Sequence, residues 1–132
     1  MKTEDLHKIL AKGENLRTEF KEAKEKVPLT FYDTVVSFLN REGGTIILGV
    51  NDEGIITGID KNSVERIKKD IVTALNCKDV INPPVNFPIY QLEDNGQVVL
   101  CLKIPVSSQI HNHGGVIYDR ENDSDIRIED DT

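Results

Sequence analysis

Residues 38–52 constrain the fold more than any other segment, because they read FLNREGGTIILGVND. A helical pattern of apolar residues over 29–41 stops at Gly43-Gly44, where glycine lets the backbone adopt positive φ and turn at once. The run over 45–50 has no polar face, which is typical of a strand buried on both sides. Residues 51–54 then carry a turn signal. The segment therefore predicts a helix that leads directly into a central strand.

The remainder of the chain alternates short helical and strand patterns. Apolar residues at helical spacing predict helices over 1–12, 29–41 and 62–76, with Asn62 and Glu65 as a capping box for the last one. Alternating or continuous apolar runs predict strands over 16–21, 45–50, 55–59, 85–92, 97–104 and 116–120. Tight turns join several of these strands. The expected fold is a single α/β (α+β) domain, with a mixed, largely antiparallel sheet and helices packed on it.

Charge divides the chain unevenly. The formal net charge is -7, which disfavours tight non-specific binding to polyphosphate. Seven of the 23 acidic residues, but only two of the 16 basic ones, lie within 119–132, so the remaining body is nearly balanced. We therefore expect an N-terminal helix over 1–11, a domain over 12–120 and an acidic C-terminal tail over 121–132.

The composition also bears on location. No apolar run approaches the roughly 20 residues that span a bilayer, so no membrane partner is expected. The two cysteines are too few for a disulfide framework, which makes a reducing cytoplasm the simplest location.

Three acidic residues form a candidate metal site. Glu14 precedes a short strand pattern that contains Glu19, and Asp52 follows the central strand. Clustered carboxylates repel one another unless a cation joins them, and Mg²⁺ or Mn²⁺ prefers oxygen ligands and activates water beside a phosphodiester. The alternative is that Glu14 and Glu19 are solvated surface acids and that Asp52 only forms a turn.

Basic residues form a candidate phosphate-contacting surface. Lys21, Lys24 and Arg41 are the expected phosphate contacts, Arg17 shares the strand face of Lys21, and Arg120 assists. The alternative is a solvated surface of mixed charge, because acidic residues interleave with these lysines. Gly43-Gly44 lacks the Gly-x-x-x-x-Gly-Lys-Ser/Thr pattern of a phosphate loop, so ATP hydrolysis by residues 1–132 alone is not expected.

Several motifs, taken in order, resemble the Schlafen AlbA_2 domain family. They are Glu14-x4-Glu19-Phe20-Lys21, the stretch from Phe38 to Asp52 with its double glycine, Gly58-Ile59, Pro83-Pro84, the strand ending at Ile104-Pro105, Ser107-Ser108 and Tyr118-x-Arg120. The resemblance covers about residues 12–120. It implies the AlbA_2-like α/β fold described above.

The resemblance implies three functions that differ in class. The first is a nucleic-acid-binding domain, for DNA or RNA, of a transcriptional regulator. The second is a metal-dependent endoribonuclease acting on structured RNA, with Glu14, Glu19 and Asp52 as catalytic and metal-binding residues, Mg or Mn as cofactor, and Asn51 as the alternative to Asp52. The third is an interaction module that forms a homodimer or contacts a downstream C-terminal domain.

Overall fold

The computed structural model describes residues 1–128. Its helices are α1 (Thr3–Lys12), α2 (Phe31–Asn40) and α3 (Val64–Leu75), and a 3-10 turn, η1 (Lys61–Ser63), leads into α3. Its strands are β1 (Thr18–Lys21), β2 (Gly44–Leu48), β3 (Ile81–Asn82), β4 (Ile89–Asp94), β5 (Gln97–Ile104), β6 (Asn112–His113), β7 (Tyr118–Glu121) and β8 (Ser124–Arg127). No helix in this part of the chain is long and apolar enough to cross a membrane.

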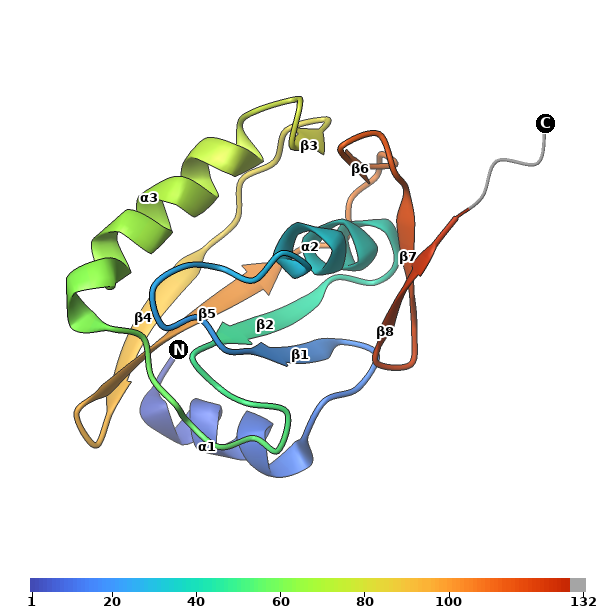
Figure 1. Cartoon of the computed structure of the whole chain (residues 1–132). Coiled ribbons are helices and arrows are strands. Elements are labelled where there is room, and N and C mark those ends of the chain that lie inside the picture. The colour runs from blue at the N-terminus through green and yellow to red at the C-terminus, as the bar shows by residue number, and fades with distance from the viewer. Residues whose placement is uncertain (129–132) are drawn as a thin grey trace.

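The main sheet has the strand order β1-β2-β5-β4 (Figure 1). β1 runs parallel to β2, whereas β5 is antiparallel to both of its neighbours. The pairs β3–β6 and β7–β8 form two small separate sheets. The sheet is mixed and largely antiparallel, and helices pack on it, so the predicted fold class is confirmed.

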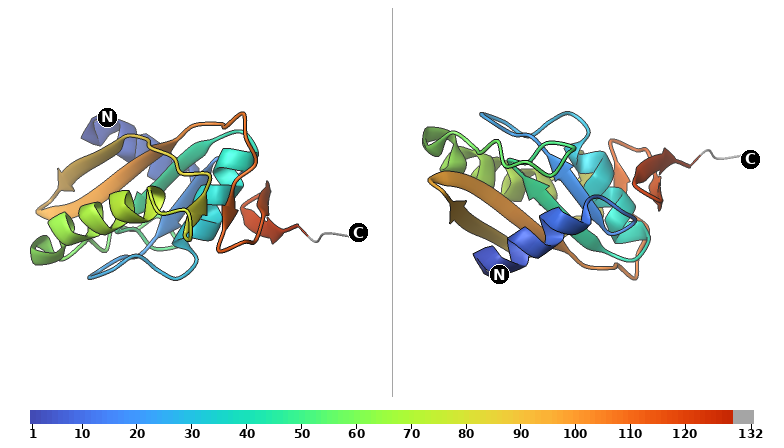
Figure 2. Two further views of the ribbon diagram at one scale, coloured as in Figure 1. Left: turned by 90° about the horizontal axis from the view of Figure 1, so that it is seen from above. Right: turned by 90° about the horizontal axis from the view of Figure 1, so that it is seen from below.

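Apolar cores lie on both faces of the main sheet. α2 and α3 cover one face, and α1 lies across the other (Figure 2). Along β5, Val98, Leu100, Leu102 and Ile104 belong to the first core, while Val99 and Cys101 belong to the second. The expected alternation of β5 is therefore confirmed.

The N-terminal helix is part of this core and not a separate unit. Leu6 of α1 is fully buried against Phe20, Ile47 and Val99 from three strands of the sheet. Burial of such a side chain contributes about 1.5–3 kcal/mol. The boundary that we placed after residue 11 therefore does not separate structural units.

The turn between α2 and β2 depends on two glycines for different reasons. Gly43 has φ +76°, and its N–H donates to the carbonyl of Phe38 at 2.7 Å, which ends the helix. Gly44 has ordinary φ but lies against the Phe38 ring and the Arg17 carbonyl, so that a Cβ there would approach both within 3.0 Å. The predicted glycine turn is present, with positive φ at Gly43 only.

Residues 55–59 do not form the strand that we expected after the turn. Only isolated bridges occur, between Val50 and Ile56 and between Ile59 and Val98. The amide oxygen of Asn51 accepts the N–H groups of Glu53 and Ile55, both at 3.0 Å. This local side-chain bonding holds a compact turn in place of a regular hairpin.

Two other predicted element boundaries are wrong. The capping box at Asn62 and Glu65 does not form, because the N-cap of α3 is Ser63 and carries no side-chain cap bond. The strand expected from residue 85 begins only at Ile89, directly after Pro88, which lacks an N–H for pairing.

The acidic segment after residue 120 is structured up to the end of the described chain. Residues 124–127 form β8, which pairs with β7 through a turn in which Asn122 has φ +54°. The expected acidic tail over 121–132 is therefore wrong for residues 121–128, and residues 129–132 lie outside the described residues. The hairpin packs on α2 (Figure 1).

We predict that Gly43→Ala lowers the free energy of unfolding by about 2–4 kcal/mol, measured by urea titration. A Cβ at this position meets the Ile104 carbonyl at 2.6 Å in addition to the cost of positive φ. Gly96→Ala is the matched control, since Gly96 has φ +77° in the tight turn between β4 and β5 but no atom within 4 Å of a built Cβ. It should cost only about 1 kcal/mol, and equal losses in both variants would contradict the close approach at Gly43.

Candidate functional site

Arg120 is buried beneath the β7–β8 hairpin. Its guanidinium donates to the carbonyl oxygens of Asn15, Leu16 and Thr18 at 3.0, 3.2 and 3.3 Å, and its Cζ lies 4.7 Å from the centre of the Phe38 ring. The residue is 1% exposed. Arg120 therefore binds the chain segment at the start of β1 and does not present its charge to a phosphate, which corrects the role we expected for it.

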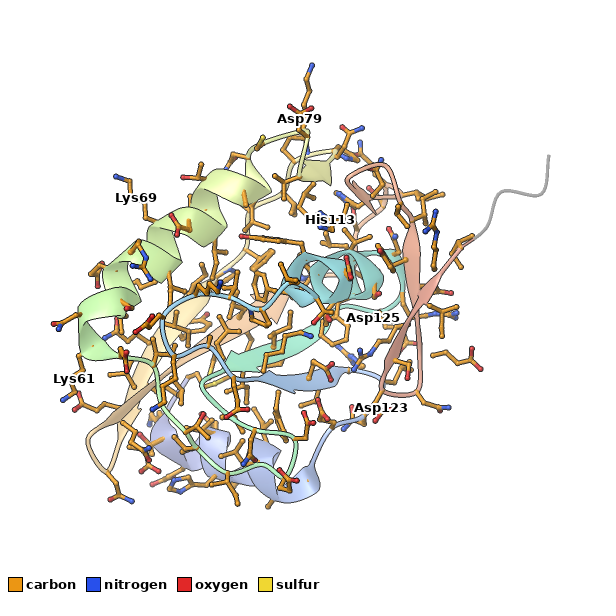
Figure 3. The ribbon with its side chains drawn as sticks, viewed as in Figure 1. Lys61, Lys69, Asp79, His113, Asp123 and Asp125 are labelled. Carbon is orange, nitrogen blue, oxygen red and sulfur yellow. The ribbon has the colours of Figure 1, made fainter. Side chains whose placement is uncertain are left out.

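One carboxylate, that of Asp125, compensates the buried charge of Arg120, and a second acidic residue lies beside it. Asp125 accepts from its Nη1 at 3.0 Å, and Glu19 lies 3.5 Å from its Nη2. The other oxygen of Asp125 accepts the Thr34 hydroxyl of α2 at 2.5 Å. Asp125 thus connects β8 of the hairpin to α2, while Asp123 lies at the hairpin tip (Figure 3).

Glu14 and Glu19 lie together, as the acidic-site hypothesis required. Burial, together with the hydrogen bond and the like charge of Glu14, raises the pKa of Glu19 to about 8. Glu14 also accepts the Phe20 N–H at 3.0 Å, and Lys21 Nζ lies 3.7 Å from Glu19. Glu19 therefore stays largely protonated near neutral pH.

Asp52 does not complete a metal site with this pair. It lies exposed in the turn after β2. Within residues 1–128 no group of three or more His, Cys, Asp or Glu side chains could hold a metal ion. Asn51, the alternative third residue, uses its amide oxygen within the turn. Within the described residues the donor set expected for Mg²⁺ or Mn²⁺ is thus not assembled.

Most of the expected phosphate-binding cations already have protein partners. Lys21 donates to the Thr30 hydroxyl at 2.9 Å, and Lys24 donates to the Thr57 carbonyl at 2.8 Å. Arg41 makes a two-pronged contact with the Asp119 carboxylate at 3.0 and 2.6 Å. These partners occupy donor hydrogens of all three side chains, and Asp119 also compensates the charge of Arg41.

Arg17 differs from these residues because it opens onto a surface depression. The depression has a volume of about 510 Å³, and its lining contains Lys103 as a second cation and no carboxylate. The lining residues are Arg17, Gly44, Thr45, Asn86, Phe87, Pro88, Lys103, Ile104 and Pro105. It lies where β2 begins and β5 ends.

The sheet register explains how Lys103 reaches this depression. Thr18, Thr45 and Lys103 are aligned across β1, β2 and β5. Their alternation places them on the sheet face that carries Val99 and Cys101, beyond the apolar part that α1 covers. Lys103 was not among the expected site residues. It is the only charged residue within the 97–104 strand pattern, and this was a usable signal.

A second, smaller depression adjoins the first. It has a volume of about 380 Å³ and is lined by Met1, Asp5, Lys8, Ile9 and Lys103. Lys103 lines both depressions and so links Arg17 in the first with Lys8 and Asp5 in the second. Sequence patterns alone gave no reason to join Lys8 to Lys103, which are far apart in the chain.

The raised pKa of Glu19 predicts a pH-dependent stability. Between about pH 4.5 and pH 8 the folded protein keeps a proton that the unfolded chain loses, so stability falls as pH rises through this range. Glu19→Gln, which stays neutral, should exceed wild type in unfolding free energy at pH 8 by on the order of 1 kcal/mol and lose this advantage near pH 4.5. Urea unfolding at both pH values measures it. Glu53→Gln, in the exposed turn, is the control, and a pH-independent effect of Glu19→Gln would contradict the raised pKa.

A family model described as Schlafen, AlbA_2 matches residues 14–129. An uncharacterized ATP-binding protein of Ureaplasma parvum serovar 3 is 28% identical over 104 residues, which cover 72% of this chain and 29% of that protein. The chain therefore spans less than a third of the length of this relative.

Two solved structures share the fold. The N-terminal domain of a Nitrosomonas europaea protein, named for its relation to the ATP-dependent DNA helicase RecG, gives a TM-score of 0.60 at 22% identity, over 80% of this chain and 74% of that one. The DIP2311 protein of Corynebacterium diphtheriae gives 0.66 at 21% identity, over 96% of this chain and 26% of that one. Together with the family match over most of its length, these findings lead to one conclusion: the chain belongs to the Schlafen AlbA_2 family.

Proposed function

We propose that this chain is a nucleic-acid-binding module that holds the phosphodiester backbone between Arg17 and Lys103. The observation that carries the proposal is the depression at the end of the sheet, where two cations share one concave surface without a lining carboxylate. Lysine and arginine side chains supply most of the affinity for nucleic acids, because their contacts release counterions from the phosphates. Thr45 adds a hydroxyl donor between the two cations.

The net charge of -7 does not oppose local binding at this surface. Two of the acids nearest to β1 and α2, Glu19 and Asp125, face inward toward Arg120. Local potential, and not total charge, steers an anion within a Debye length of the surface. Phe87 is the sole aromatic residue in the lining, so base stacking contributes little and we expect weak sequence preference.

The relatives support a role within a larger assembly. One relative is named as an ATP-binding protein, and a structural neighbour is named for a DNA helicase. In both proteins the matched region is an N-terminal domain or a fraction of the whole chain. We propose that this module delivers nucleic acid to a second domain of a transcriptional regulator, and that the second domain performs any ATP-dependent step.

An endoribonuclease remains the second candidate because Glu14 and Glu19 are in contact beside Lys21. Two carboxylates next to a lysine resemble part of a phosphodiester-cleaving site. Asp52 does not complete a metal site with them, since it is exposed and residues 1–128 contain no three-ligand cluster. We therefore favour binding without cleavage and derive no metal-dependent step.

We predict salt-dependent binding that requires Arg17 and Lys103. Fluorescence anisotropy with a labelled single strand of about 20 nucleotides should show affinity falling between about 50 and 200 mM salt. The double variant Arg17→Ala/Lys103→Ala should bind roughly tenfold more weakly, with a salt slope smaller by about 1–2.

The matched control removes the same charge elsewhere. Lys61→Ala/Lys69→Ala changes two exposed lysines on η1 and α3, which point away from the body of the protein (Figure 3). This variant should bind nearly as wild type. Equal losses in the two double variants, or binding that does not respond to salt, would contradict the proposed surface.

We also predict that the protein does not cleave tRNA in the presence of Mn²⁺. The measurement is a gel assay of intact and cleaved tRNA over time, with Glu19→Ala and Glu53→Ala run beside wild type. Cleavage that is lost in Glu19→Ala and kept in Glu53→Ala would replace the binding proposal by the nuclease. Cleavage that persists in both variants would indicate a contaminating enzyme.

A further inference from the structure

The two edges of the main sheet differ in how they are covered. At the β1 edge, the guanidinium of Arg120 donates to the carbonyl oxygens of Asn15, Leu16 and Thr18. These carbonyl groups are therefore not available to pair with another strand. At the opposite edge, β4 pairs with β5 on one side only. Figure 2 shows β4 as the outer strand of the sheet. Within residues 1–128, no further strand pairs with it.

The register fixes which backbone groups of β4 face outward. The Lys103 N–H donates to the Pro88 carbonyl at 3.2 Å, which marks these residues as a hydrogen-bonded pair. Hydrogen-bonded and non-hydrogen-bonded pairs alternate along an antiparallel ladder. Tyr90, Leu92 and Asp94 therefore bond to β5, while the N–H and C=O groups of Ile89, Gln91 and Glu93 point away from the sheet. An open row of this kind is a template for another strand.

We propose that two copies of this chain associate through β4, antiparallel about a two-fold axis at Gln91, and form one continuous sheet. This register pairs Gln91 with Gln91 of the second copy, and Ile89 with Glu93 of the second copy. Each of these outward-facing pairs exchanges two backbone hydrogen bonds. The interface is isologous, as expected for a two-fold dimer.

Charges along β4 favour a second copy in this register. Glu93 meets an apolar residue and not itself, whereas an axis at Glu93 would oppose two like charges. Lys68 of α3 lies 3.1 Å from the Gln91 side-chain oxygen. Glu93 of each copy contacts Lys61 of its own chain at 3.2 Å and is the diagonal neighbour of Gln91 across the axis, so Lys68 brings a second cation toward that carboxylate.

Side chains on the other face of β4 add an apolar contact. Tyr90 is 36% exposed, although it lies beside partly buried Leu92 at the edge of the second core. In the proposed register Tyr90 of each copy faces Leu92 of the other copy. An interface built mainly from one strand is small, so we expect a dissociation constant in the micromolar range.

Sedimentation velocity of the full chain tests this proposal over a concentration range that brackets micromolar dissociation. Wild type should shift from its 14.8 kDa monomer toward twice that mass as concentration rises. Gln91→Pro removes an N–H that β5 does not use, so the fold should survive while the dimer weakens at least tenfold. Gln91→Ala keeps the N–H and is the matched control. A wild type that stays monomeric, or a Pro variant that dimerises as wild type does, would overturn the proposal.

Disulfide trapping tests the register independently. Paired Cα atoms in a hydrogen-bonded antiparallel pair lie about 5.5 Å apart, within the range that a disulfide bridges. In a Cys77→Ser background, Gln91→Cys should form a covalent dimer under mild oxidation, visible on a non-reducing gel. Glu53→Cys, in the exposed turn after β2, should not. Equal cross-linking at both positions, or no covalent dimer of the Gln91→Cys variant, would exclude the two-fold pairing.

Discussion

The buried guanidinium of Arg120 is the interaction on which the arrangement of this domain depends. It joins three parts of the chain that are distant in sequence: the segment leading into β1, the β7–β8 hairpin and the Phe38 ring of α2. A buried charge is tolerated only where hydrogen bonds and opposite charges replace water. Three carbonyl groups and the carboxylate of Asp125 meet that requirement, and Glu19 lies 3.5 Å from the same guanidinium. The hairpin, the edge of β1 and the acidic pair are therefore energetically coupled.

Local patterns predicted the elements whose burial follows from their own residues. The two-residue period of β5 placed its side chains on the correct faces, and the apolar stripe followed by two glycines located α2 and β2. The strand expected over 55–59 failed because the Asn51 side chain satisfies the backbone of the turn locally. β8 was missed because a short, mostly charged segment gives no apolar signal. It is held by Asp125, whose partners come from α2 and β7.

The candidate sites show the same division between local and long-range information. Glu14 and Glu19 lie together, as expected, because they are close in the chain and the bridge between Asn15 and Thr18 folds the segment between them back on itself. The role of Asp52 depended on how the loop after β2 folds, and no three-ligand metal group forms within the described residues. Arg120 was expected to assist at the phosphate surface, but the groups that bind it belong to a segment about 100 residues away in the chain. The partnership of Arg17 with Lys103 could only appear once β1, β2 and β5 were in register.

The position of α1 has a practical meaning for how the limits of this domain are drawn. Likeness to the family begins at residue 14, after the helix has ended. Yet Leu6 fills the space over Phe20, Ile47 and Val99, all of which are almost fully inaccessible to water in the intact chain. A fragment trimmed to the family match would expose an apolar sheet face and be prone to aggregation. For this protein, the structural unit starts earlier than sequence similarity suggests.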